Sequence, residues 1–167
     1  MINMQSIRLF YILIFLTCVS LLGFGLYLEH VKGLEPCPLC VFQRVAYIAI
    51  AIISLIATIH GPGKIFTWIY SSLIDIAALC GAGVAGRQIW LQHLPADQVP
   101  ECGPGLEYML EAFPLGEALN MILSGSGECA EVQWRFIGLS IAEWSLFCFV
   151  IFIILSLTSI LYAKRAM

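Results

Sequence analysis

Charged residues are scarce in this sequence. They make up 11% of its 167 residues, whereas 60% are hydrophobic, and the mean hydropathy is +0.93. This balance lies outside the range of soluble domains. Four nearly uncharged runs are each long enough to cross a bilayer, which takes about 20 helical residues. They cover residues 9–28, 41–59, 65–85 and 144–162. We therefore expect an all-α membrane protein, a four-transmembrane-helix bundle in one integral membrane domain over residues 1–167, with no room for a separate soluble domain.

The sequence also lacks the signatures of two kinds of redox cofactor site. The sequence has no Gly-x-Gly-x-x-Gly fingerprint, which argues against a tightly bound nicotinamide or flavin of the Rossmann kind. Its three histidines, His30, His60 and His93, lie at span ends or in loops, with His60 on the opposite side from the other two. This placement argues against a membrane haem held by paired histidines. If the chain carries electrons, the acceptor is expected to be dissolved in the bilayer, and a quinone is the obvious candidate.

The basic residues indicate the orientation of the bundle. With four spans, both termini and the turn at residues 60–64 lie on one side, and the loops at about 29–40 and 86–143 lie on the other. The eight basic residues divide equally between the sides, but those on the terminus side are concentrated in short segments without an acidic residue. These are Arg8, Lys64, Lys164 and Arg165. The positive-inside rule then predicts cytoplasmic termini and periplasmic loops.

The seven cysteines fall into two groups. Three lie inside predicted spans, where a lone cysteine is usually a small buried hydrophobe: Cys18, Cys80 and Cys148. Four lie outside or at the edge of the spans: Cys37, Cys40, Cys102 and Cys129. An even set on an oxidising side of the membrane predicts two disulfides, and four cysteines allow three pairings.

The Cys37-x-x-Cys40 pair stands where the second apolar run begins. Proline is tolerated in a helix only in its first turn, so Pro38 predicts Cys37 as the N-cap and Cys40 as the third helical residue. Arg44 then falls on the same face as Cys40, one turn deeper. The helix N-terminus and the guanidinium both favour a thiolate at Cys40. We infer a reactive dithiol at the membrane surface; a zinc site, a structural disulfide and a snorkelling Arg44 are the alternatives.

The long loop carries two amphipathic patterns and the other two cysteines. Apolar residues recur with helical spacing over residues 106–113 and again over 115–122, which predicts two short helices lying on the bilayer surface. Cys102 lies among prolines and glycines, and Cys129 follows a Ser/Gly turn. We expect both sulfurs on exposed, bendable backbone, which suits thiol-disulfide exchange. A purely structural bridge between them is the alternative.

Several of these features together resemble one family. They are Cys37-Pro38-Leu39-Cys40 with Gln43-Arg44 at the head of the second span, Cys102 and Cys129 in one loop, and Gly127-Glu128-Cys129-Ala130-Glu131 followed by Gln133-Trp134. Over essentially its whole length the chain is similar to the bacterial disulfide bond formation protein DsbB family.

The resemblance implies an inner-membrane, quinone-dependent oxidase that re-oxidises the periplasmic thioredoxin-fold protein DsbA. On this sequence, DsbA would attack Cys102 of a Cys102–Cys129 disulfide, giving a mixed disulfide at Cys102. Cys129 would then attack Cys37 and free Cys40 beside a non-covalently bound ubiquinone or menaquinone. Arg44 matches the family's quinone-site arginine, and His93 is the candidate for a quinone-linked histidine. The partners are thus a DsbA-like protein, lipid and quinone, with no nucleic acid and no metal.

Three points of the sequence stay open beside this resemblance. Gln43 stands where some family members have an acid, which bars a proton-transfer role for it. Asp75 lies in the middle of the third span, where an ionisable group is costly, and a protonated, hydrogen-bonded Asp75 is as good an account as a functional one. The competing readings are a vitamin K epoxide reductase type of enzyme, whose Cys-x-x-Cys lies late in the chain, and a non-enzymatic four-span protein with two structural disulfides.

Overall fold

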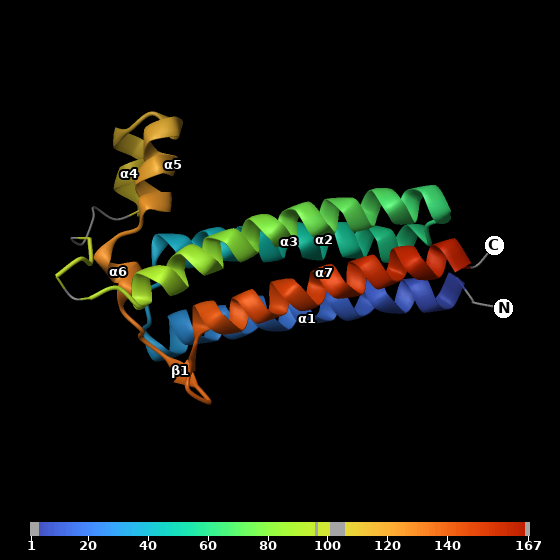
Figure 1. Ribbon diagram of the computed structural model, residues 1–167, viewed down its shortest axis with the longest axis horizontal. Helices are drawn as coiled ribbons and strands as arrows, with labels where there is room; N and C mark the ends of the chain where they lie inside the picture. Colours follow the sequence, from blue (N-terminus) through green and yellow to red (C-terminus); the bar gives the residue numbers. More distant parts are fainter. Residues whose placement is uncertain (1–3, 96, 101–105, 166–167) are drawn as a thin grey trace.

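The computed structural model describes residues 4–95, 97–100 and 106–165. Within this part of the chain, four long helices are apolar enough to cross a membrane. They are α1 (Met4–Lys32), α2 (Pro38–His60), α3 (Lys64–Gln92) and α7 (Ile141–Arg165). Figure 1 shows them side by side, with both ends of the chain at one end of the bundle and the loop elements at the other. The predicted all-α four-helix membrane bundle is confirmed, and the chain is a multi-pass membrane protein.

The four helices are longer than the apolar runs of the sequence. Helix α3 continues to Gln92, beyond the span end predicted at Ala85. Its buried residues alternate in steps of three and four from Thr67 to Leu91, and this seam packs against α2 and α7. Most residues of the seam are small or polar, so the neighbouring helices approach α3 closely. The exact limits of the bilayer along these helices, and the single-domain organisation, stay predictions.

Aromatic side chains fill the middle of the bundle. The rings of Tyr47 on α2 and Phe149 on α7 are stacked with centroids 4.5 Å apart, and the ring of Phe152 meets Tyr47 edge-on at 6.2 Å. Gly81 on α3 lies against the Phe149 ring, where a Cβ atom would overlap it. The absence of a side chain at Gly81 thus lets α7 pack closely against α3.

Buried hydroxyl groups join the helices nearer the termini. The Tyr11 hydroxyl lies 3.0 Å from the Ser71 hydroxyl, which lies 2.9 Å from that of Ser159. Asp75 is one turn of α3 away from Ser71, and its Oδ1 atom is buried with no hydrogen-bond partner among the described residues. The structure assigns Asp75 no contact with the cysteine site at the other end of the bundle.

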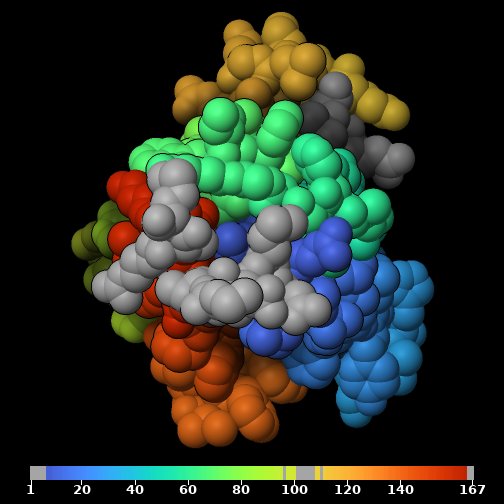
Figure 2. Space-filling model, turned by 90° about the vertical axis from the view of Figure 1, so that its right-hand side faces the viewer, coloured from blue at the N-terminus to red at the C-terminus, as the bar shows by residue number. Residues whose placement is uncertain are grey.

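The long loop forms three short helices and a two-stranded hairpin. Helices α4 (Leu106–Ala112) and α5 (Leu115–Ser124) confirm the two predicted from periodicity. Helix α6 (Gly127–Ala130) and the strands β1 (Arg135–Phe136) and β2 (Leu139–Ser140) were not predicted. In Figure 2, which views the bundle from the end with the termini, α4 and α5 (gold) project beyond one side and the hairpin region (orange) beyond the other. Contact of α4 and α5 with a bilayer surface stays a prediction.

Candidate functional site

The N-terminus of α2 presents two sulfurs on one face, as the sequence predicted. Cys37 is the N-cap residue, with φ −65° and ψ 159°, and Pro38 and Leu39 make the first two helical positions. The Cys40 backbone N–H points at the Cys37 sulfur at 3.4 Å, and the two Sγ atoms lie 3.0 Å apart. Both cysteines are free thiols. The cap therefore brings the pair close enough to exchange between dithiol and disulfide with little movement of the backbone.

Cys129 lies beside this pair, inside helix α6. Its side chain is fully buried and packs in one apolar cluster with Cys37, Leu39 and Leu91. The Cys129 sulfur lies 3.7 Å from the Ser126 hydroxyl, and the Cys37 thiol and the backbone of Leu39 both act on its acidity. The expectation of an exposed, bendable Cys129 is wrong, because four residues of α6 and the packing over α2 bury its sulfur.

The groups around Cys129 make its thiol acidic. Interaction with the Cys37 thiol is the largest cause that lowers the pKa of Cys129, and the backbone groups of Leu39 and Ser126 act in the same direction. Burial acts in the opposite direction. Together these effects lower the pKa of Cys129 to about 6. Hydrogen bonding to the sulfurs of Cys129 and Cys40, together with burial, raises the pKa of Cys37. At neutral pH the Cys129 thiol is thus largely ionised, whereas the Cys37 thiol keeps its proton.

A buried glutamine that sequence reasoning missed contacts both sulfurs of the dithiol. Gln88 on α3 directs its Nε2 atom at Cys40 Sγ, 3.2 Å away, and at Cys37 Sγ, 3.3 Å away. Its Oε1 atom accepts a hydrogen bond of 2.7 Å from Gln43 Nε2 on α2. The signal in the sequence was the helical spacing of Ala85, Gln88 and Leu91, which continues the buried seam of α3 past the last purely apolar residues.

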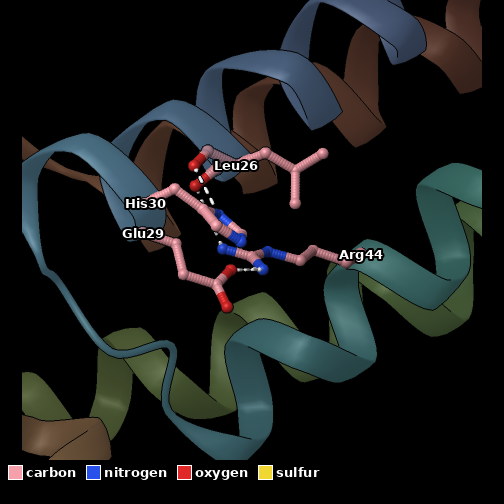
Figure 3. Close-up of polar contacts among 5 residues, drawn as sticks. Leu26, Glu29, His30 and Arg44 are labelled. Carbon is pink, nitrogen blue, oxygen red and sulfur yellow. Dashed lines mark hydrogen bonds and ion pairs between the residues drawn. The ribbon is translucent and has the colours of Figure 1, made fainter.

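Arg44 is held by the end of helix α1. Figure 3 shows its side chain reaching from α2 to Glu29, and the guanidinium forms an ion pair with that carboxylate. A second guanidinium nitrogen donates to the Gly25 carbonyl at 3.2 Å. The sequence predicted that Arg44 would lie one turn below Cys40 on the same face, and both residues line one cavity. The ion pair with Glu29 was not anticipated, because pairing between different helices cannot be read from spacing along one of them.

That cavity lies between α1, α2 and α7, beneath the loop that follows α6. Its volume is about 450 Å³, within the range of small-molecule sites. Apolar and aromatic side chains make most of its wall, among them Trp134, Phe136 and Trp144. Cys40 and Arg44 line it as well, so a sulfur and a cation face the same apolar space.

Two of the predicted site residues remain. Cys102 is outside the described residues, so its pairing with Cys129 stays a prediction. His93 caps the C-terminus of α3, is exposed, and has its Nδ1 atom 2.8 Å from the Ile89 carbonyl. It is not among the described residues that line the cavity. Its assignment to quinone binding therefore rests on the resemblance alone.

The geometry supports a definite kind of chemistry. Three sulfurs follow one another from α6 to the cavity: Cys129 contacts Cys37, and Cys37 contacts Cys40. Thiolate attack on a disulfide sulfur needs such neighbours, since each exchange joins the attacking sulfur to the nearer atom of the target bond and releases the farther one. The arrangement can pass a pair of electrons from the loop to the edge of an apolar pocket.

Comparison with known proteins agrees with this chemistry. Residues 7–159 match the family model described as disulfide bond formation protein DsbB. Among curated relatives, disulfide bond formation protein B of Hahella chejuensis is 55% identical over 86% of this chain and 87% of its own length. The protein of the same name from Aromatoleum aromaticum is 53% identical over 86% of each chain, and that from Acinetobacter baumannii is 50% identical over 91% of this chain and 90% of its own.

Proposed function

The chain belongs to the DsbB family of disulfide bond formation proteins, and from this premise we propose a specific route for its electrons. It is a membrane oxidoreductase of protein disulfide bond formation. In our proposal it re-oxidises a DsbA-like periplasmic dithiol protein through Cys102, Cys129, Cys37 and Cys40 and delivers the electrons to a membrane quinone. The observation that carries the proposal is the packing of the acidic Cys129 thiol against Cys37, whose sulfur lies 3.0 Å from that of Cys40.

The exchange begins in the loop. A thiolate of the partner protein attacks Cys102 of a Cys102–Cys129 disulfide, which forms the mixed disulfide at Cys102 and releases Cys129 as a thiolate. Cys129 attacks Cys37 of the Cys37–Cys40 disulfide, a Cys37–Cys129 bond forms, and the electron pair of the broken bond stays on Cys40. The lowered pKa of Cys129 supports this role, because it leaves as a stable anion and attacks without a separate base.

The remaining steps restore both disulfides. The second thiolate of the partner displaces Cys102, which attacks Cys129 and leaves Cys37 and Cys40 reduced. Withdrawal of two electrons from that pair closes the Cys37–Cys40 bond again. Overall, one partner dithiol becomes a disulfide, and its two electrons and two protons reduce one quinone to a quinol.

The cavity fits a quinone by volume and by its mostly apolar wall. Ubiquinone or menaquinone has a flat ring with two carbonyl oxygens, which suits a pocket of about 450 Å³ whose lining includes the Arg44 guanidinium as well as Glu35, Glu128 and Glu131. When bound, a quinone supplies the two-electron acceptor of the reaction. The Arg44 guanidinium would donate to a ring oxygen and stabilise negative charge there. Trp134 and Trp144 would hold the ring between apolar surfaces, and Cys40 would lie next to it.

The proposed reaction also indicates the orientation of the chain and the membrane in which it lies. Thiol oxidation needs an oxidising compartment, so we propose that α4–α6 and the cysteines face the periplasm and that both termini lie in the cytoplasm. The basic residues of the terminus side agree with this orientation. The membrane is then the bacterial inner membrane, where quinones are dissolved.

The test is an anaerobic assay with the purified chain in lipid nanodiscs. Reduced DsbA and ubiquinone are mixed with wild-type protein, and loss of DsbA thiols is followed with quinol formation. We expect one quinol per DsbA disulfide, and no quinol from Cys40→Ser or Cys129→Ser protein. Turnover that continues without quinone, or that survives Cys40→Ser, would overturn the proposal.

A further inference from the structure

The buried amide of Gln88 occupies the position of an anion-binding group for the dithiol. Gln88 is 4% exposed and Gln43 is 3% exposed, and they come from different helices. Two glutamines buried in an apolar bundle need partners, because an unpaired amide there is costly. A bond between the two alone would satisfy only half of the Gln88 amide. Its Nε2 atom instead lies 3.2 Å from Cys40 Sγ and 3.3 Å from Cys37 Sγ, with one hydrogen available for each sulfur.

Gln43 fixes which end of the Gln88 amide faces the sulfurs. Gln43 Nε2 donates to Gln88 Oε1 at 2.7 Å, which engages the carbonyl. Cys40 Sγ lies 3.6 Å from this oxygen and closer, at 3.2 Å, to Gln88 Nε2, so the NH₂ group is the nearer end of the amide to that sulfur. A carboxamide donor has no charge and keeps its protons at any working pH. It can therefore stabilise a thiolate without protonating it, and it leaves no buried charge unpaired when both sulfurs are in the neutral disulfide.

We propose that Gln88 is a catalytic residue that binds the thiolate of Cys40, and that Gln43 is the positioning residue that aims it. The inference rests on the proposed function. When the Cys129 thiolate bonds to Cys37, the Cys37–Cys40 bond breaks and its electron pair moves to Cys40 Sγ, with no proton transferred. Negative charge thus appears on the half-buried Cys40 at the wall of the cavity, and the nearest donor among the described side chains other than cysteine is Gln88 Nε2.

The proposal gives Gln88 and Arg44 different roles. Arg44 is engaged by Glu29 and the Gly25 carbonyl, while the hydrogen bonds to the sulfurs come from Gln88. In this proposal Arg44, which lines the cavity, serves the ring, and the neutral amide serves the leaving sulfur. The sequence-based expectation that Arg44 itself favours the Cys40 thiolate stays a prediction beside this contact from another helix.

The test measures the reduction potential of the Cys37–Cys40 pair in full-length Cys102→Ser/Cys129→Ser protein. Gln88→Met removes both donors and keeps an unbranched side chain of similar length. Stabilisation of the thiolate favours the reduced form, so we expect the equilibrium constant for reduction to fall about tenfold, which is about 30 mV toward lower potential. Gln43→Met keeps Gln88 but frees its orientation, and it is expected to shift the potential in the same direction by less. Ser71→Ala, which removes a buried hydroxyl from the same helix about 25 Å away, is the control and leaves the potential unchanged.

A second measurement separates catalysis from packing. In the same background, the rate at which iodoacetamide alkylates Cys40 at neutral pH is expected to fall about tenfold in Gln88→Met, because fewer molecules hold the thiolate. The inference would be overturned if both Gln88→Met and Gln43→Met had the same potential and the same alkylation rate as the parent protein. If Gln88→Met does not fold, the result for Gln43→Met decides alone. Neither measurement uses quinone, so the two proposals can fail separately. If the wild-type chain turns over with quinone but the potentials of Gln88→Met and Gln43→Met are unchanged, this inference is rejected and the proposed function stands.

Discussion

Cys37 and Cys129 pack in one buried cluster, although one stands at the head of a membrane span and the other lies in the long loop. This contact connects the two halves of the chemistry. It makes Cys129 acidic and holds it against the sulfur that it attacks in the proposed exchange. Since Cys37 also touches Cys40, the same residue links the loop with the cavity.

The acidity of Cys129 gives a pH profile for the reduced Cys102→Ser protein. The pKa is lowered from its ordinary value of 9.0 to about 6, so the thiolate is present above pH 6 and is lost as the pH falls through that value. Alkylation of Cys129 by iodoacetamide, read by peptide mass spectrometry, is therefore expected to be half-maximal near pH 6.

The matched variant for this profile is Cys37→Ala in the same background. It removes the largest cause of the lowered pKa and keeps the N–H groups of Leu39 and Ser126. The midpoint is expected to move up toward 9. An unchanged midpoint in Cys37→Ala would show that the Cys37 thiol does not control the acidity of Cys129.

Arg44 is expected to control quinone affinity and not thiol exchange. A hydrogen bond from a charged group contributes about 1.5–3 kcal/mol, so Arg44→Met should raise the KM for quinone about 10- to 100-fold. Glu29→Gln removes the carboxylate that positions the guanidinium and leaves the bond to Gly25, and a smaller rise is expected. Steady-state quinone titrations give these values. Exchange of Cys102–Cys129 with reduced DsbA should stay at the wild-type rate in both variants, and a loss of that exchange would place Arg44 in the thiol chemistry instead.

Gly81 and Gly83 form a matched pair for testing the core. A Cβ atom at Gly81 would overlap the Phe149 ring, whereas one at Gly83 meets no atom within 4 Å. Gly81→Ala is expected to destabilise the bundle by about 1–3 kcal/mol through overpacking. Gly83→Ala is expected to be neutral or to stabilise by up to about 1 kcal/mol, because alanine is the better helix former. Unfolding in mixed detergent micelles measures both, and equal stabilities of the two variants would contradict the packing of Phe149 on Gly81.

Local chemistry made much of this site predictable. The bundle followed from four apolar runs, and Pro38 fixed Cys37 as the N-cap and Cys40 as the third helical residue. Arg44 followed from helical spacing. Periodicity also gave α4 and α5, since each has one apolar face. These predictions succeeded because each depends on residues within two turns of one another.

The parts that sequence reasoning missed depend on contacts between distant segments. Cys129 looked exposed because a Ser/Gly stretch precedes it, yet packing of α6 over the head of α2 buries it. Gln88 followed Gly86 and Arg87, which read as the start of a loop, and only the position of α3 beside α2 brings its amide to the sulfurs. The partner of Arg44 was missed for the same reason, because Glu29 belongs to another helix.

The most direct test of the central claim is which sulfur of the Cys-x-x-Cys pair joins Cys129. Cys40→Ser/Cys102→Ser protein keeps Cys37 with Cys129, and Cys37→Ser/Cys102→Ser protein keeps Cys40 with Cys129. Both are oxidised with a mild thiol oxidant, and the internal disulfide is timed by non-reducing peptide mass mapping. We predict that the Cys37–Cys129 bond forms at least about tenfold faster than the Cys40–Cys129 bond, since a misplacement of about 1 Å costs up to about 10²-fold in rate. Equal rates, or a faster Cys40–Cys129 bond, would contradict the proposed path of the electrons.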